Sequence, residues 1–184
     1  ASLPRNSQFY LNFDKANQLP FSAPELIPRI NHKKRCQFDA IELPERYLFV
    51  PFQVPHDTQI ACYSPWLKSM EALYDAVVAS VRELADPNLK VVFKEHPSWH
   101  KHYAHLYDKD DVAIFANGNC TRELINGAEA VITINSTVGL ESLLLDKQVI
   151  ALGLACYNID ELVLRASDQA TLIKCLEKLL NGWQ

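Results

Sequence analysis

Short apolar runs alternate along this chain with segments in which apolar residues recur every three or four positions. The runs are typical of strands buried on both faces of a parallel sheet, and the wider spacing is typical of helices with one apolar side. The pattern predicts strands at residues 47–50, 90–94, 112–115, 130–134 and 148–152. Strands and helices that alternate in this way predict an α/β fold, a Rossmann-like parallel sheet with helices on both faces.

The strongest helix pattern follows Ser64 and Pro65. Serine is a favoured N-cap and proline suits the first helical position, so the helix is expected to begin here. Apolar residues then recur as far as Leu84, and Asp86–Pro87 is expected to end the helix. Further helices are predicted at residues 121–126, closed by a glycine, at about 137–145, and over the apolar residues of 172–180.

The first 45 residues have a different character. They hold five of the ten prolines, and they sustain neither a two-residue nor a 3.6-residue period. Because proline fixes its own φ and lacks an N–H donor, we expect residues 1–45 to form a proline-rich arm or interdomain connector, followed by one domain over residues 46–184. The apolar residues of the arm predict that it packs on a surface, since a free tail would be more polar.

Length and composition exclude several classes of protein. With 184 residues, of which 48% are hydrophobic and 22% charged, the chain can bury a core and is not a disordered protein. Eighteen Lys and Arg against 22 Asp and Glu give a net charge of -4 without a basic block, so nucleic acid is not an expected partner. No apolar run approaches the ~20 residues of a membrane span, so we expect at most peripheral membrane contact.

The five cysteines are odd in number, widely spaced and without a CxxC pair. Neither a disulfide framework nor a zinc site is expected from them, and scattered thiols fit a reducing cytoplasm. The N-terminus lacks a signal pattern, and the chain begins at Ala1 rather than Met. We therefore expect a cytoplasmic protein whose chain has been cut or processed.

Three polar segments directly follow predicted strands, at residues 53–59, 95–97 and 135–141. In open α/β sheets, ligands bind outside the carboxyl ends of the strands. Because parallel strands end at the same edge of a sheet, we expect the three segments to converge on one site.

The turn Asn135–Ser136–Thr137 opens a predicted helix. Free N–H groups, the positive end of the helix dipole and two hydroxyls favour a phosphate there, whereas the alternative is that Ser136 only caps the helix. Gly139 leaves room for a ligand or a strand to approach closely. Glu141 lies one turn beyond Thr137 on the same face, where it suits the hydroxyls of a ribose or is simply solvated. The chain has neither GxGxxG nor GxxxxGK[ST], which excludes a standard dinucleotide site or P-loop.

His96 follows a strand and precedes Pro97, which holds the peptide extended. A histidine in this place can donate to a phosphate oxygen or act as an acid toward a leaving phosphate, or it is an ordinary residue of the rim. His100, His102 and His105 follow closely, but their spacing does not place all three on one helix face and no cysteine is near. No metal site is therefore expected.

Asp57 lies in the polar segment after the first predicted strand. A carboxylate at such a rim suits a nucleophile or base in transfer at an anomeric carbon. It suits equally well a cap for the turn before Ser64. The local pattern leaves both possibilities open.

Three stretches together resemble the capsule polysaccharide biosynthesis proteins, bacterial β-Kdo transferases that use CMP-Kdo. They are Gln53-x-x-x-Asp57-Thr58-Gln59, Phe93-Lys94-Glu95-His96-Pro97 and Ile134-Asn135-Ser136-Thr137-Val138-Gly139-Leu140-Glu141, and residues 148–157 resemble the end of that family's domain. The resemblance covers about residues 46–160. It implies a GT-B glycosyltransferase, in which two Rossmann-like halves face each other across a cleft. Residues 46–184 resemble the C-terminal half, which binds the nucleotide-sugar.

The resemblance also implies which residues bind the nucleotide. They are His96, Pro97, Ser136, Thr137, Gly139 and Glu141. His96 matches the histidine expected at the CMP phosphate, and the two hydroxyls of Ser136 and Thr137 match the pair at the same phosphate. Glu141 matches the carboxylate expected toward the cytidine ribose.

Asp57 matches the acidic position of that family's glutamine-containing loop. With His96 it is the expected catalytic pair, since a retaining transfer needs a carboxylate on the face of the sugar. Gln53, His56 and Gln59 are expected near the sugar or the acceptor. The resemblance implies no metal and no cofactor, with the CMP-sugar donor as substrate.

The implied function is transfer of Kdo to a glycan or glycolipid acceptor of capsule or lipopolysaccharide, at the inner face of the bacterial inner membrane. The chain is too short for both halves of a GT-B enzyme, so the N-terminal, acceptor-binding half is expected to be a missing partner. Two alternatives stay open: a GT-B relative that uses a UDP-sugar or CDP-polyol, and a non-catalytic α/β interaction module.

Overall fold

The computed structural model describes residues 38–55, 57–99 and 101–182. The predictions for His56 and His100, and those for the first 37 residues of the arm, lie outside the described residues. Within the described part of the chain, no helix combines the length and the apolar character needed to cross a membrane.

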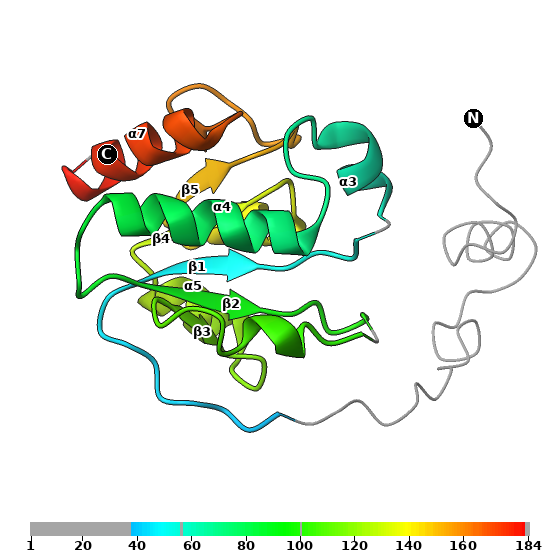
Figure 1. Cartoon of the computed structure of the whole chain (residues 1–184). Helices are drawn as coiled ribbons and strands as arrows, with labels where there is room; N and C mark the ends of the chain where they lie inside the picture. The colour runs from blue at the N-terminus through cyan, green and yellow to red at the C-terminus, as the bar shows by residue number, and fades with distance from the viewer. Residues whose placement is uncertain (1–37, 56, 100, 183–184) are drawn as a thin grey trace, which may run out of the picture. The chain divides into compact units, whose positions relative to one another are not determined.

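A six-stranded sheet forms the centre of the structure (Figure 1). Its strands are β1 (Tyr47–Pro51), β2 (Lys90–Lys94), β3 (Ala113–Phe115), β4 (Ala130–Thr133), β5 (Gln148–Ala151) and β6 (Leu164–Arg165). They lie in the order β3-β2-β1-β4-β5-β6, and each neighbouring pair is parallel. The predicted Rossmann-like parallel sheet is thus confirmed.

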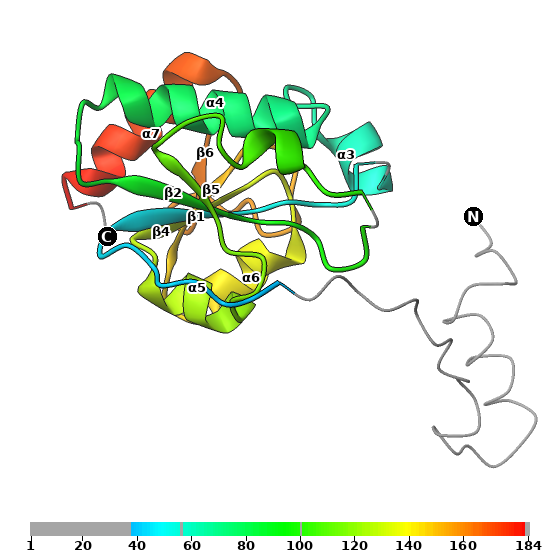
Figure 2. The same ribbon diagram turned by 60° about the horizontal axis from the view of Figure 1, so that its bottom comes forward.

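Helices cover both faces of this sheet. They are α3 (Thr58–Tyr63), α4 (Met70–Glu83), α5 (Thr121–Gly127), α6 (Thr137–Leu143) and α7 (Gln169–Leu180), with a short 3₁₀ turn at Ala104–Leu106. Figure 2 shows α4 and α7 on one face and α5 and α6 on the other. The helix α3 lies at the end of the sheet at which β1 finishes (Figure 1).

The side chains of β1 alternate between two apolar cores. Leu48 and Val50 belong to the core beneath α4 and α7, whereas Tyr47 and Phe49 belong to the core on the side of α5. Successive residues of a strand point to opposite faces, so a central strand needs apolar residues at every position. This explains why the strands appear in the sequence as unbroken apolar runs.

The long helix α4 begins later than the sequence pattern predicts. Its N-cap is Ser69, whose hydroxyl accepts a hydrogen bond from the N–H of Ala72 at 3.1 Å. Ser64 instead ends α3, and its hydroxyl donates to the carbonyl oxygen of Leu67. Leu67 is buried although it lies outside the helix, so its contribution to the apolar spacing was misleading. The prediction that the helix begins at Ser64 is therefore wrong.

Two short elements were not predicted. The helix α3 has six residues, of which Ile60 alone is buried, and β6 has only two residues. Elements of this length bury too few apolar residues to produce a recognisable period. The helices α5 and α6 end within two residues of the predicted bounds, and α7 begins three residues before the predicted range, as is usual for helix termini.

The strand order reverses between β1 and β4. From β1 the chain proceeds outward to β2 and β3, and then it returns to place β4 on the other side of β1. The crevice at the carboxyl ends of two such strands is the usual ligand site of an open α/β sheet. The segments after β1 and β4 border this point directly, and the segment after β2 lies next to them.

Candidate functional site

Hydrogen bonds join the ends of β1, β2 and β4 at the carboxyl edge of the sheet. The N–H of Phe52 donates to the carbonyl oxygen of Lys94 at 2.8 Å, which ties the end of β1 to the end of β2. Gln53 Nε2 donates to Asn135 Oδ1 at 3.0 Å, and Asn135 N donates to Gln53 Oε1 at 3.2 Å. The three polar segments singled out in the sequence are therefore adjacent.

The Gln53–Asn135 pair is buried. The two residues are 5% and 6% exposed, and Asn135 Nδ2 donates in addition to the carbonyl oxygen of Gln59 at 2.8 Å. Buried amides of this kind are stable only when their polar atoms are paired. Both polar groups of the Gln53 side chain are thus hydrogen-bonded to Asn135 rather than available to a sugar. The Gln59 side chain is exposed nearby.

Ser136 is the N-cap of α6, as the more conservative interpretation of the sequence predicts. Its Oγ accepts from the N–H of Val138 at 3.2 Å, and its carbonyl oxygen accepts from the N–H of Gly139 at 3.0 Å. Two of the N–H groups expected for a phosphate are thus engaged within the turn. The hydroxyl hydrogen of Ser136 and the exposed hydroxyl of Thr137 remain, and Thr137 Oγ1 has no partner among the described residues.

Gly139 is surrounded by protein rather than open to a ligand. A Cβ at this position would lie 2.3 Å from the hydroxyl oxygen of Tyr157 and 2.6 Å from its Cζ. The Tyr157 hydroxyl donates to the carbonyl oxygen of Ser136 at 2.6 Å, and burial raises its pKa well above the ordinary value. The space that was predicted to admit a ligand or a strand at Gly139 is occupied by an aromatic side chain instead.

Glu141 lies exposed on α6, one turn after Thr137. Its carboxylate forms no hydrogen bond or ion pair with any residue of the described ranges. It is therefore available to accept hydrogen bonds from a ligand bound over the start of α6.

His96 lies half-buried just after β2. Its Nδ1 accepts from the N–H of Ser98 at 3.2 Å, so the neutral ring carries its proton on Nε2. The exposed Pro97 follows, and the N–H of Trp99 donates to the His96 carbonyl oxygen at 3.0 Å. The segment is thus a tight turn that presents a ring N–H donor near the rim.

Asp57 is the N-cap of α3. Its Oδ1 accepts from the N–H of Gln59 at 3.1 Å, and the residue is exposed. The capping role considered for Asp57 is confirmed, although it acts on α3 rather than on a helix starting after Ser64. The second carboxylate oxygen is not part of this cap.

Glu95 is a site residue that the sequence did not distinguish. It is 7% exposed, and its Oε1 accepts from the N–H of Tyr103 at 2.7 Å and from the hydroxyl of Tyr107 at 2.8 Å. Its Oε2 lies 2.6 Å from His102 Nδ1. This carboxylate holds both ends of the loop that begins with His96. A charged residue after an apolar strand was the only signal, and it does not identify the distant partners.

Potential metal ligands do not gather in the described part of the chain, and its cysteines are free thiols. No group of three or more His, Cys, Asp or Glu side chains is placed to hold a metal ion within the described ranges. Cys62, Cys120 and Cys156 are exposed free thiols, and Cys175 is a buried one.

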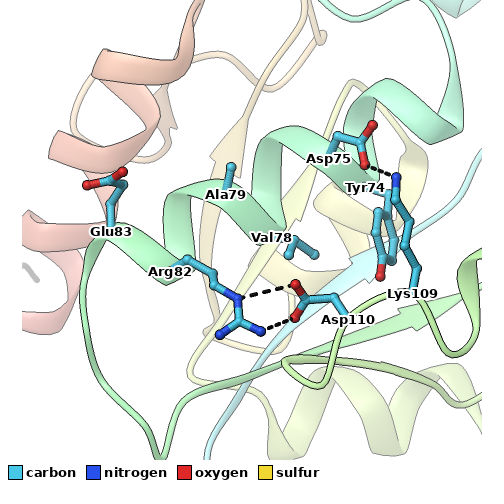
Figure 3. A pocket seen from close by; sticks show the side chains of 8 residues that line it. All are labelled: Tyr74, Asp75, Val78, Ala79, Arg82, Glu83, Lys109 and Asp110. Atoms are coloured by element: carbon cyan, nitrogen blue, oxygen red, sulfur yellow. Dashed lines mark hydrogen bonds and ion pairs between the residues drawn. The ribbon is translucent and has the colours of Figure 1, made fainter.

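A hollow of about 440 Å³ lies beside the second half of α4, away from the rim. Figure 3 shows that its two cations, Lys109 and Arg82, are each paired with a carboxylate. Lys109 Nζ lies 2.6 Å from Asp75 Oδ1, and Arg82 Nη2 lies 2.8 Å from Asp110 Oδ1. Because these cations already have carboxylate partners, we assign no ligand to this hollow.

Known proteins share both the sequence and the fold. Protein FixF of Sinorhizobium fredii is 43% identical over 183 residues, which is 99% of this chain and 43% of FixF. A Thermosulfurimonas dismutans KpsC structure described as a β-Kdo 2,7 transferase is 27% identical, with a TM-score of 0.53, over 70% of this chain and 41% of that one. This chain thus spans less than half the length of these relatives.

The fold is shared more widely than the sequence. The UDP-GlcNAc 2-epimerase of Methanocaldococcus jannaschii, solved with UDP-GlcNAc and UDP, has a TM-score of 0.55 over 77% of this chain and 41% of its own. At 16% identity this likeness concerns the fold alone. The sequence model of the family described as capsule polysaccharide biosynthesis protein matches residues 29–175. The chain is therefore a member of the capsule polysaccharide biosynthesis protein family.

Proposed function

We propose that this chain is the nucleotide-sugar-binding half of a glycosyltransferase and that its donor is CMP-Kdo. Family membership and the likeness to a β-Kdo transferase support a glycosyl-transfer enzyme in general. The observation that supports this donor site best is the adjacency of the segments after β1, β2 and β4, which the Gln53–Asn135 pair holds together at the switch point.

In this proposal the donor phosphate lies between the His96 ring and the turn before α6. The Nε2–H of His96 and the hydroxyls of Ser136 and Thr137 donate to phosphate oxygens. Such donors stabilise the charge that develops as the bond between phosphate and sugar breaks. The exposed carboxylate of Glu141 accepts from the ribose hydroxyls.

Asp57 is the proposed carboxylate for chemistry at the anomeric carbon. Its position as the N-cap of α3 anchors one oxygen and holds the side chain at the rim. The other oxygen then stabilises or attacks the positively charged sugar carbon as the phosphate leaves. The chain covers under half of its relatives, so the opposite wall of the cleft, with the rest of the acceptor site, is assigned to the remainder of such an enzyme.

Thermal unfolding with CMP, UMP, UDP or buffer alone tests the donor. At a concentration near 100 Kd, a nucleotide adds about 2.7 kcal/mol to the free energy of unfolding and raises the Tm by several degrees. We expect this shift with CMP only. We also expect Glu141→Ala and His96→Ala to reduce it, and Glu177→Ala, which removes an exposed carboxylate on α7, to leave it unchanged.

The alternatives predict different outcomes. A preference for UMP or UDP would favour a GT-B relative that uses a UDP-sugar. The epimerase that shares this fold was solved with UDP-GlcNAc and UDP. No shift with any nucleotide would contradict the proposed donor site and favour an interaction module.

A further inference from the structure

A second hollow, of about 410 Å³, lies at the same edge of the sheet as the proposed donor site. One wall is the entry to α4, with Lys68 and Glu71, and the other is the loop after β2, with Trp99, Lys101, His102 and His105. Its volume falls in the range of about 300–1,000 Å³ that is typical of small-ligand pockets. The nucleotide proposed above does not use any of these side chains.

The charges that line this hollow are unbalanced. Lys68 and Lys101 are exposed, and neither forms an ion pair with another described residue. Glu71 is the single lining carboxylate, and its Oε1 lies 4.0 Å from His105 Nε2. In the hollow of Figure 3, by contrast, Arg82 and Lys109 each have a carboxylate partner. Two unpaired cations in a concave site favour an anionic ligand.

The wall formed by the loop after β2 is held in place by buried contacts. Glu95 engages His102 Nδ1 at 2.6 Å and fixes the main chain of Tyr103 through its N–H. An ionised carboxylate only accepts hydrogen bonds, so Nδ1 is the donor and Nε2 of the neutral ring is an acceptor for a hydroxyl of a ligand. A site built before its ligand arrives loses less entropy on binding.

Trp99 adds an aromatic surface between these charges. It lines the hollow and also packs against the buried core, which limits its motion. The backbone N–H of Trp99 donates to the carbonyl oxygen of His96. This side of the hollow is therefore continuous with the turn that is proposed to bind the donor phosphate. Cations around an aromatic ring suit a ligand that has both an apolar face and a negative group, which describes an acidic sugar.

We propose that this hollow binds the carboxylate or phosphate of an acidic sugar in the acceptor, beside the donor nucleotide. The anion lies between Lys68 and Lys101, His102 Nε2 accepts from a hydroxyl of the sugar, and the apolar face of the sugar ring lies against Trp99. The identification of this sugar as the acceptor rests on the proposed function, because only a donor at His96 makes its neighbour the acceptor.

Isothermal titration of the 184-residue chain with free Kdo, glucose 6-phosphate and glucose tests the site, with and without saturating CMP. We expect at least one of the two acids to bind and neutral glucose not to bind. Lys68→Ala and Lys101→Ala should each lower the affinity for the acid about fivefold. Lys174→Ala removes an exposed lysine on α7 and should change nothing. Preference for Kdo identifies a carboxylate site, and preference for glucose 6-phosphate a phosphate site.

Several results would overturn the inference. It fails if neither acid binds, if the Lys68 and Lys101 variants bind as the wild type does, or if CMP displaces the acid, which would place the acid at the nucleotide rim. Lysine-dependent binding of an acid by a chain that binds no CMP would uphold the anion site and contradict the proposed donor. The two hypotheses are therefore tested separately.

Discussion

The lack of a side chain at Gly139 helps to shape the proposed donor site. The Tyr157 ring occupies the space beside this glycine and donates its hydroxyl to the carbonyl oxygen of Ser136. A tyrosine hydroxyl is protonated at neutral pH, and because burial raises the Tyr157 pKa further, it remains a donor in alkaline solution as well. Tyr157 thus braces the turn whose hydroxyls are assigned to the phosphate.

Substitution Gly139→Ala should destabilise the fold. The added Cβ overlaps Tyr157, which must move and lose its hydrogen bond, and overpacking of this kind costs about 1–3 kcal/mol. Urea unfolding measures the loss. Tyr157→Phe removes only the hydrogen bond and should cost about 1 kcal/mol. A Gly139→Ala variant that unfolds like the wild type but no longer binds CMP would instead indicate a direct ligand contact at this glycine.

At the scale of elements, the site depends on a connection between loops that are 82 residues apart in the sequence. Gln53 follows β1 and Asn135 follows β4, and each supplies the donor that the other accepts. Asn135 also bonds to the carbonyl oxygen of Gln59 in α3. The amide pair thus fixes the turn before α6 relative to the helix that Asp57 caps.

Substitution Gln53→Ala should weaken both the fold and nucleotide binding. It leaves the buried Asn135 N–H and side-chain oxygen unpaired, which costs about 1–3 kcal/mol, and it releases the turn that carries Ser136. Urea unfolding and the CMP-induced shift in Tm measure the two effects. Gln59→Ala is the matched control, because that side chain is exposed.

The result also distinguishes two roles for this glutamine. A Gln53→Ala variant with unchanged stability but weakened binding of Kdo would support the sugar contact that the sequence suggests. Loss of stability without any sugar present would support the connecting role.

At the scale of the whole molecule, the sheet supplies one wall of the proposed reaction site. The described segments that carry the proposed donor and acid-binding residues all lie at its carboxyl edge, and the matches cover only 43% of FixF and 41% of the KpsC chain. A single wall leaves the reacting sugar exposed to water, whereas transferases exclude water from the reacting centre.

We therefore expect the 184-residue chain to bind CMP-Kdo without transferring Kdo to a glycan acceptor. Release of CMP, compared with and without acceptor, measures this. Acceptor-dependent release by the chain alone would contradict the prediction and show that this half suffices. If transfer does occur, Asp57→Asn should abolish it while leaving CMP binding intact.

The sequence by itself determined the layers of this protein. The apolar runs at β1, β2 and β4 leave no polar face to expose, and they specify strands buried beneath helices on both sides. Because parallel strands end at one edge, the polar residues that follow them also predicted the side of the sheet on which the candidate site lies.

Only the tertiary structure decided which neighbours those polar residues have. Whether Gln53 faces a sugar or Asn135, and whether Gly139 admits a ligand or Tyr157, depends on side chains distant in the sequence. Likewise, Ser64 and Ser69 are equally good local caps, and the burial of Leu67 selects Ser69. A local sequence pattern reflects the backbone and the burial of one element. Contacts such as Gln53 with Asn135 and Gly139 with Tyr157 depend on how separate elements pack, so no short segment of sequence specifies them.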